Sequence, residues 1–203
     1  METRRAFLEV ATAAALAGSL PPAATAAGTS KKRIAIITTL WSYLRHGQHI
    51  GDRFLIGYPW AGDWHQPELE VVSAWVDQVP TAADRKSREA EYGFPQGDLS
   101  KPRAREFGFH LFPTVAETLR CGGRKLAVDG VVIIAEHGEY PTNEKGQKLY
   151  PRARIFGEVV KVFEQDKRAV PVFNDKHLSY SFSKAQAMVS ASRRLDFPLL
   201  AGS

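Results

Sequence analysis

The segment AVDGVVIIAE, residues 127–136, places the strongest constraint on what this chain can fold into. Its valines and isoleucines form a nearly unbroken run, so a strand made from it would be apolar on both sides. Strands of this kind are typical of parallel sheets that carry helices on both faces. The segment therefore predicts a central strand of an α/β fold.

Strands and helices are predicted to alternate along the rest of the chain. The predicted strands are residues 33–38, 69–77, 109–112, 127–136, 169–173 and 197–202, and the predicted helices are residues 44–57, 101–108, 114–123, a segment through 155–163 and one that ends near 191. Thr114 and Glu117 have capping-box spacing at the start of one helix. This alternation predicts a Rossmann-like, doubly wound parallel sheet of about six strands.

Two segments between these elements are predicted to be irregular. Residues 57–68 are rich in glycine and proline, and residues 78–100 are polar and interrupted by Pro80, Pro95 and Gly97. We therefore expect both to form exposed loops. Because ligands of doubly wound sheets bind beyond the carboxyl ends of the strands, candidate site residues are sought directly after each strand.

The first 30 residues predict an export signal. Arg4 and Arg5 precede an alanine-rich apolar segment of about eleven residues, and small residues follow. The arginine pair resembles the twin-arginine signature of exported, already folded proteins. The apolar segment is shorter than the roughly 20 residues that span a bilayer, so no stable membrane anchor is expected after cleavage near Ala26 or Ala27. Residues 31–203 would then form a periplasmic or extracellular domain.

Charge and cysteine content restrict the expected partners. The chain has 27 basic and 22 acidic residues, a formal net charge of +5 and a pI near 9.4. The charges are intermixed and no basic run alternates with aromatic residues, so nucleic acid is not an expected partner. Cys121 is the single cysteine, which excludes an internal disulfide.

Several short strings, taken in order, resemble one known family. They are Ile34 to Thr38, Asp77, AREFGFHLFPTVAETL (104–119), VDGVVIIAE (128–136), VFNDKHLS (172–179) and FPLLAGS (197–203). Their order resembles the N-terminal nucleotide-binding domain of the glucose-fructose oxidoreductase / inositol dehydrogenase family, Gfo/Idh/MocA. The resemblance covers residues 33–203. It implies hydride transfer between NAD or NADP and the hydroxyl group of a small sugar or polyol.

The family also has a second α/β domain, which supplies the floor of the substrate site, an acid/base residue and the oligomer interface. The 203 residues contain no counterpart of it. The resemblance therefore implies that the chain represents the nucleotide-binding part, either as a fragment of a longer protein or as a domain on its own. Homo-oligomers are expected only if the second domain exists.

The turn after the first strand departs from the family pattern. The usual G-x-G-x-x-G is replaced by TTLWSYLRHGQH (38–49), which places Thr38 and Thr39 where glycines normally approach the pyrophosphate. Their hydroxyl groups and a helix N-terminus are predicted to hold an anion instead, with help from Arg45. Such a phosphate site would be looser than the standard one.

Three further residues are candidate cofactor ligands. Asp77 ends the second predicted strand, where a carboxylate can accept both ribose hydroxyls and would repel a 2′-phosphate, so it favours NAD over NADP. Glu136 and His137 directly follow the central strand, at the position that packs near the nicotinamide in the family. A strand-ending turn and a solvated loop are the alternative interpretations of these positions.

The polar residues Asp175, Lys176 and His177 follow the fifth predicted strand, where the family has Glu-Lys-Pro. The resemblance implies that Lys176 faces the substrate hydroxyl, because an ammonium group there can orient an alcohol and stabilise an alkoxide. Asp175 keeps the acidic neighbour, and His177 replaces the proline by a titratable ring. A salt-bridged polar turn at the rim of the sheet is the alternative.

Two other functions stay open. A module that kept the fold but lost the glycines would bind or scaffold without catalysis. A metal-assisted enzyme would use His46, His49 and Asp52 on one helix face, with His65 nearby. The sequence has neither a cysteine cluster nor an H-E-x-x-H string, so these histidines are interpreted as ordinary surface residues. No metal is therefore expected.

Overall fold

The computed structural model describes residues 30–93 and 97–202. The strands of the main sheet are β1 (Lys32–Thr38), β4 (Leu69–Val76), β5 (His110–Leu111), β6 (Gly130–Ile134), β7 (Val172–Asp175) and β8 (Leu199–Gly202). The helices are α1 (His46–Ile56), α2 (Ala82–Tyr92), α3 (Ser100–Phe107), α4 (Val115–Arg120), α5 (Arg152–Asp166) and α6 (Phe182–Arg194). The predicted export signal lies outside the described residues.

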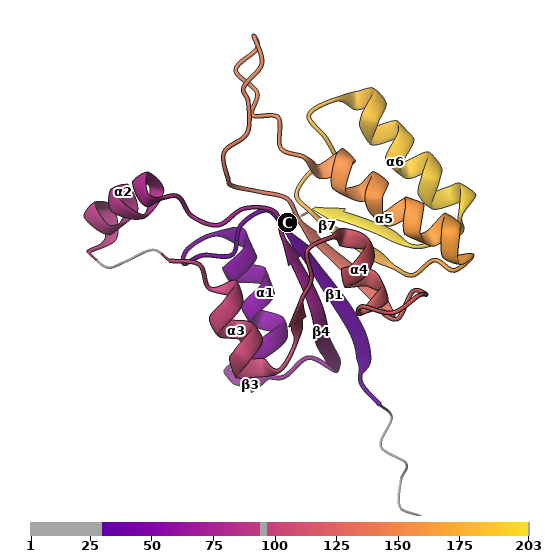
Figure 1. Ribbon diagram of the computed structural model, residues 1–203, viewed down its shortest axis with the longest axis horizontal. Coiled ribbons are helices and arrows are strands. Elements are labelled where there is room, and N and C mark those ends of the chain that lie inside the picture. The colour runs from indigo at the N-terminus through magenta and orange to yellow at the C-terminus, as the bar shows by residue number, and fades with distance from the viewer. Residues whose placement is uncertain (1–29, 94–96, 203) are drawn as a thin grey trace, which may run out of the picture. The chain divides into compact units, whose positions relative to one another are not determined.

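The six strands run parallel in the order β5-β4-β1-β6-β7-β8 (Figure 1). Counted along the chain, this is the order 3-2-1-4-5-6 of the Rossmann fold. The first strand, β1, therefore lies at the centre of the sheet. The next two strands, β4 and β5, form one half, and β6, β7 and β8 form the other half. The predicted doubly wound parallel sheet is confirmed.

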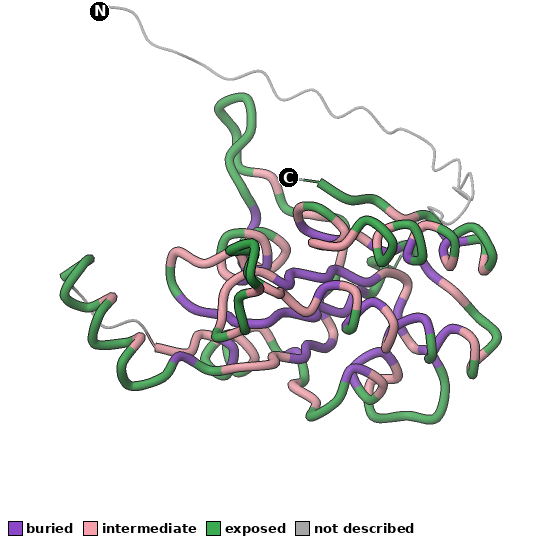
Figure 2. The backbone as a smooth tube through the Cα atoms, turned by 90° about the horizontal axis from the view of Figure 1, so that it is seen from above, coloured by how far each residue is buried: buried purple, intermediate pink, exposed green. Residues whose placement is uncertain are grey.

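Successive side chains of β1 and β6 point to opposite faces of the sheet, which divides the core into two layers. Ala35, Ile37 and Ile133 belong to a buried cluster with residues of α4, α5 and α6, whereas Ile36 and Ile134 pack with residues of α1 and α3 on the other face. The buried positions of both strands form the purple centre in Figure 2. Because both faces are covered, the apolar run in residues 131–135 is fully buried, as predicted.

The prediction that residues 57–68 are irregular was wrong. They contain an antiparallel hairpin of β2 (Tyr58–Trp60) and β3 (Asp63–His65), a second sheet separate from the first. The two residues between the strands, Ala61 and Gly62, have φ values of 52° and 92°. Positive φ at both positions gives the tight turn that matches the twist of a two-stranded ribbon.

The prediction that residues 78–100 form only an exposed loop was also wrong, since α2 lies within them. The side chain of Thr81 accepts a hydrogen bond from the backbone N–H of Asp84, and Gly93 ends the helix in the left-handed conformation. None of the residues of α2 is buried. Caps at both ends and good helix-forming residues therefore form this helix without a contribution from the core.

None of the helices in the described part of the chain combines the length and the apolarity that crossing a bilayer requires.

Candidate functional site

The strand order reverses between β1 and β6, and this is where the candidate site lies. From β1 the chain continues to α1 on one face of the sheet, and from β6 it continues through a long loop to α5 on the other face (Figure 1). The two connections diverge at the carboxyl ends of the strands, which opens a crevice between them. Most of the site residues predicted from the sequence lie around this crevice.

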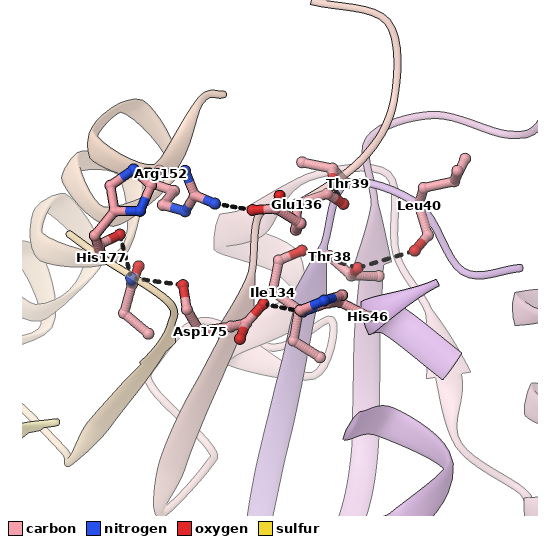
Figure 3. Close-up of polar contacts among 10 residues, drawn as sticks. Thr38, Thr39, Leu40, His46, Ile134, Glu136, Arg152, Asp175 and His177 are labelled. Carbon is pink, nitrogen blue, oxygen red and sulfur yellow. Dashed lines mark hydrogen bonds and ion pairs between the residues drawn. The ribbon is translucent and has the colours of Figure 1, made fainter. Parts of the chain in front are cut away.

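Thr38 and Thr39 join the ends of β1 and β6. The Thr38 hydroxyl donates to the carbonyl oxygen of Ile134 at 3.0 Å and lies 3.3 Å from that of Leu40. The Thr39 hydroxyl donates to the carbonyl oxygen of Glu136 at 2.7 Å (Figure 3). Both threonines are fully buried. Their hydroxyl protons are thus used within the protein, and their contact with a phosphate stays a prediction.

Glycines of α1, rather than of the turn, provide the close packing beside β1. A Cβ atom on Gly47 would lie 2.2 Å from the carbonyl oxygen of Leu40, and one on Gly51 would lie 2.7 Å from the Trp41 ring. Trp41 is fully buried, and its Nε1–H donates to Asp52 Oδ1 at 3.2 Å. The start of α1 is therefore seated directly on the turn that follows β1.

The first turn of α1 is open to an anion. Arg45 is its N-cap residue, no side chain caps the helix, and the first turn contains no acidic residue. The N–H of Gln48 donates to the carbonyl oxygen of Arg45 at 3.0 Å, and the first-turn amides before it carry partial positive charge without an intrahelical acceptor. Arg45 adds a full positive charge at the same place, although it is also paired with Asp84 at 3.1 Å.

The polar residues after β7 have distinct partners. Asp175 Oδ2 lies 2.7 Å from Nδ1 of His46, the first residue of α1 (Figure 3). Asn174 donates from its side-chain amide to the carbonyl oxygens of Asp175 and His177, at 3.1 and 3.3 Å. These bonds close a tight turn in which Lys176 has a φ of 64°. The turn orients Asp175 toward α1, while Lys176 is only partly buried at the rim.

Glu136 forms an ion pair with Arg152, the first residue of α5 (Figure 3). The Arg152 side chain is 1% exposed, and its guanidinium carbon lies 5.2 Å from the centre of the Tyr150 ring. Burial lowers the pKa of Arg152, while the Glu136 and Asp175 carboxylates oppose that shift. Arg152 Nη1 also lies 3.4 Å from His177 Nε2. Burial lowers the pKa of His177, and the charge of Arg152 lowers it further.

His137 lies between two basic residues of α1. Arg45 Nη1 donates to His137 Nδ1 at 3.1 Å, and the rings of His137 and His46 are 5.3 Å apart. Since a guanidinium only donates, Nδ1 of His137 must be the unprotonated nitrogen. Burial, and then the neighbouring positive charge of Arg45, lowers the pKa of His137 to about 4. His137 is therefore neutral at neutral pH.

The low pKa of His137 is expected to make the fold sensitive to acid. The folded-state value is about 4, against 6.5 for an ordinary histidine, so the unfolded state binds more protons between these values. The stabilisation is complete above pH 6.5 and is lost as the pH falls toward 4; for a partly buried ring it amounts to about 1–3 kcal/mol. Urea unfolding across this range should show that the free energy of unfolding falls more steeply with decreasing pH for the wild type than for His137→Gln.

The exposed His110 provides the control for this measurement, and His110→Gln should follow the wild-type curve. An H137Q variant whose stability fell as steeply as that of the wild type would contradict the role given to His137.

Asp77 is set apart from the crevice. Its Oδ2 accepts hydrogen bonds from the Tyr140 hydroxyl at 2.7 Å and from Arg154 Nη2 at 3.0 Å. Burial, followed by the Asp77 carboxylate, raises the pKa of Tyr140 well above its ordinary value. The neighbouring Gln78 instead binds the backbone of Glu139, accepting from its N–H at 2.8 Å and donating to its carbonyl oxygen at 3.1 Å. The ribose role of Asp77 stays a prediction.

A cavity of about 230 Å³ lies beside the crevice. It is formed by the start of α1, the segment after β4 and the loop after β6, and its polar lining includes Arg45, Gln78, Asp84, His137, Lys148 and Tyr150. Asp77 does not line it. The cavity thus combines basic side chains with hydrogen-bonding groups at the edge where a Rossmann sheet binds its ligand.

Arg152 was not predicted from the sequence, and His46 was predicted only as a possible metal ligand. A signal for His46 was present, because it opens the helix after the first strand. No local pattern marks Arg152 as buried. Asp52, another residue of the metal hypothesis, faces away from the crevice and pairs with Arg103 at 2.8 Å. Among the described residues, no group of three or more histidine, cysteine, aspartate or glutamate side chains is placed to hold a metal ion.

Comparison with known proteins finds likeness only among solved structures. No protein-family model and no curated protein matches the chain. An NAD-binding oxidoreductase from Klebsiella pneumoniae is 14% identical with a TM-score of 0.49, covering 85% of this chain and 34% of that chain. The myo-inositol 2-dehydrogenase from Lactobacillus plantarum is 14% identical with a TM-score of 0.47, covering 84% and 36%.

The biliverdin reductase from Synechocystis sp. PCC 6803, solved with biliverdin and NADP+, is 13% identical with a TM-score of 0.46, covering 84% of this chain and 37% of that chain. The chain thus spans about a third of the length of these proteins. The fold assignment itself rests on the strand order.

Proposed function

We propose that this chain is the nucleotide-binding part of an NAD(P)-dependent oxidoreductase that acts on a sugar or polyol hydroxyl. The observation that carries the proposal is the reversal of strand order between β1 and β6, with the uncapped start of α1 at the resulting crevice. Parallel sheets with this order bind dinucleotides at that place, with the pyrophosphate at the helix start.

The cavity beside the crevice offers two basic side chains to the phosphates of a dinucleotide, Arg45 and Lys148, although Asp84 and Glu139 line it as well. Arg45 Nε is buried and has no hydrogen-bond partner, and Lys148 lies on the same cavity. We assign the pyrophosphate to the first-turn amides of α1 and to Arg45, because the hydroxyl protons of Thr38 and Thr39 are already donated. A bound nicotinamide would supply the hydride acceptor. Glu136 and His137 would border it, and Lys176 would orient the substrate hydroxyl.

Nicotinamide dinucleotide binding is the test of this function. Calorimetric titration of the full chain with NAD+, NADH, NADP+ and NADPH at millimolar concentration should give measurable binding to at least one of them. Arg45→Ala should weaken that binding by about tenfold or more, since it removes a charge-assisted phosphate contact. Arg168→Ala, which removes an exposed arginine that donates to the Leu126 carbonyl and to Asp129, is the control and should bind like the wild type. The proposal is refuted if none of the four dinucleotides gives heat on titration and none raises the unfolding temperature.

A second candidate function is a non-catalytic binding or scaffold module. It is favoured by the turn after β1, where buried Leu40 and Trp41 replace the glycines and both threonine hydroxyls bond to the main chain. A folded full-length protein without affinity for any nicotinamide dinucleotide would support this function instead.

We further propose export by the twin-arginine route, supported by Arg4, Arg5 and the short apolar segment that follows them. Fractionation of cells expressing the full chain should recover the processed protein outside the cytoplasm. Retention of the processed form in the cytoplasm would refute the proposal.

A further inference from the structure

A histidine and a buried carboxylate from distant parts of the chain meet at the crevice. His46 begins α1 and Asp175 ends β7, 129 residues later in the sequence. His46 Nδ1 and Asp175 Oδ2 are 2.7 Å apart, the Asp175 side chain is 0% exposed and the His46 side chain is 26% exposed. The carboxylate is therefore inside the protein, and the ring is partly open to solvent.

This hydrogen bond determines the tautomer of His46. An ionised carboxylate only accepts hydrogen bonds, so Nδ1 carries the proton that it donates to Asp175. In the neutral ring the lone pair is then on the opposite nitrogen, Nε2. Nε2 has no hydrogen-bond partner among the described residues. His46 thus presents a free base on the side of the ring that faces away from Asp175.

Charged groups of both signs surround the pair. Asp175 Oδ1 is buried without a hydrogen-bond partner, so the carboxylate charge is not distributed over other donors. That charge would stabilise an imidazolium on His46. Four other groups face the ring or adjoin the pair. They are neutral His137 at 5.3 Å, Arg45 before His46 in the chain, Lys176 after Asp175, and Arg152, which the Asp175 carboxylate attracts. The three cations oppose a second positive charge, and Asp175 counteracts them.

We propose that His46 is the catalytic base of the site and takes the proton of the substrate hydroxyl at Nε2, with Asp175 as its positioning residue. This inference rests on the proposed oxidoreductase function. The substrate O–H bond breaks as the N–H bond forms on His46, and the adjacent C–H bond gives its electron pair, as hydride, to oxidised nicotinamide. The alcohol becomes a carbonyl compound, and His46 becomes an imidazolium beside Asp175.

The first test examines the free protein and needs no dinucleotide. Long-range proton–nitrogen NMR of the full chain, labelled with ¹⁵N-histidine, should show neutral His46 protonated at Nδ1, with the signal assigned by its loss in His46→Gln. In Asp175→Asn, the Nδ1–H preference should be lost. A neutral His46 protonated at Nε2, or an imidazolium that persists through neutral pH, would overturn the proposal even if dinucleotides bind.

The second test measures turnover with NAD+ or NADP+ and a panel of polyols that includes myo-inositol and glucose. His46→Gln should lower kcat by about 100-fold or more while the dissociation constant of the dinucleotide stays within about twofold. His49→Gln, one turn along the same helix and exposed, should have the wild-type rate. Unchanged turnover in H46Q would overturn the role of His46 and leave the proposed function intact. If no dinucleotide binds but His46 has the expected tautomer, the function is refuted together with the proton transfer that depends on it, and only the Asp175–His46 geometry stands.

Discussion

Replacing Glu136 by alanine is expected to lower the free energy of unfolding by about 3–5 kcal/mol. The reason is the environment of Arg152, whose side chain is 1% exposed and would keep its charge after losing its carboxylate partner. An unpaired buried charge is far less stable than a solvated one. Weaker interactions remain: Arg152 Nη1 lies 3.4 Å from His177 Nε2, and the guanidinium carbon lies 5.2 Å from the centre of the Tyr150 ring. The Asp175 carboxylate still attracts the charge, but no hydrogen bond joins it to Arg152. Urea unfolding at neutral pH measures the loss.

The control for this prediction is an ion pair of the same type on the surface. Glu164, on the same helix as Arg152, pairs with Arg194 at 2.8 Å, and the two side chains are 40% and 58% exposed. Glu164→Ala should change stability by about 1 kcal/mol or less, because both charges remain solvated. Equal losses for Glu136→Ala and Glu164→Ala would show that the burial of Arg152 is not the cause.

Replacing Gly47 by alanine is expected to lower the free energy of unfolding by about 3 kcal/mol, at the upper end of the range for overpacked sites. The added Cβ would lie 2.2 Å from the backbone oxygen of Leu40 and 3.0 Å from the Thr38 hydroxyl oxygen. Backbone cannot rotate away as a side chain can, so α1 would have to move off the turn after β1. That movement would also displace His46 from Asp175.

Gly157→Ala is the matched control, since Gly157 also lies within a helix but an added Cβ would have nothing within 4 Å. This change should raise stability by about 0.5–1 kcal/mol, because alanine restricts the unfolded chain and favours the helix. Thermal unfolding of both variants would separate the effects. A Gly47→Ala variant as stable as Gly157→Ala would refute the close contact between α1 and Leu40.

The sheet was predictable because its signal is local and strong. Runs of valine and isoleucine identify the buried strands of β1, β4 and β6, and the intervening helical patterns indicate a parallel sheet. The failures concern segments that owe little to the core. In α2, the caps Thr81 and Gly93 and the helix-forming residues between them form a helix inside a segment whose polarity and prolines indicated a loop. In the β2–β3 hairpin, the conformation of two turn residues decides the structure.

The sequence indicated the edge of the sheet at which the candidate site lies, but not which side chains form hydrogen bonds or ion pairs there. Searching directly after the strands selected Glu136, His137 and Asp175, and the fold brings the three to the same edge of the sheet. Their roles in a site stay predictions. Their partners come from helix starts: Arg45 and His46 were noted in the sequence, but as an anion ligand and a metal ligand, and Arg152 looks like an ordinary surface residue. Which of them face inward depends on how α1 and α5 are seated on the sheet, and that depends on contacts between residues far apart in the chain.

The central position of β1 has a consequence for how the chain folds. Thr38 bonds to Ile134, 96 residues later, and His46 to Asp175, 129 residues later. The entropy of these long loops is lost before their contacts contribute any favourable free energy. Folding should therefore be slower than that of helical domains of similar size. On the ribosome, the first strand must wait for most of the chain to be synthesised. The crevice can form only after β7 has emerged, so partly synthesised chains lack it altogether.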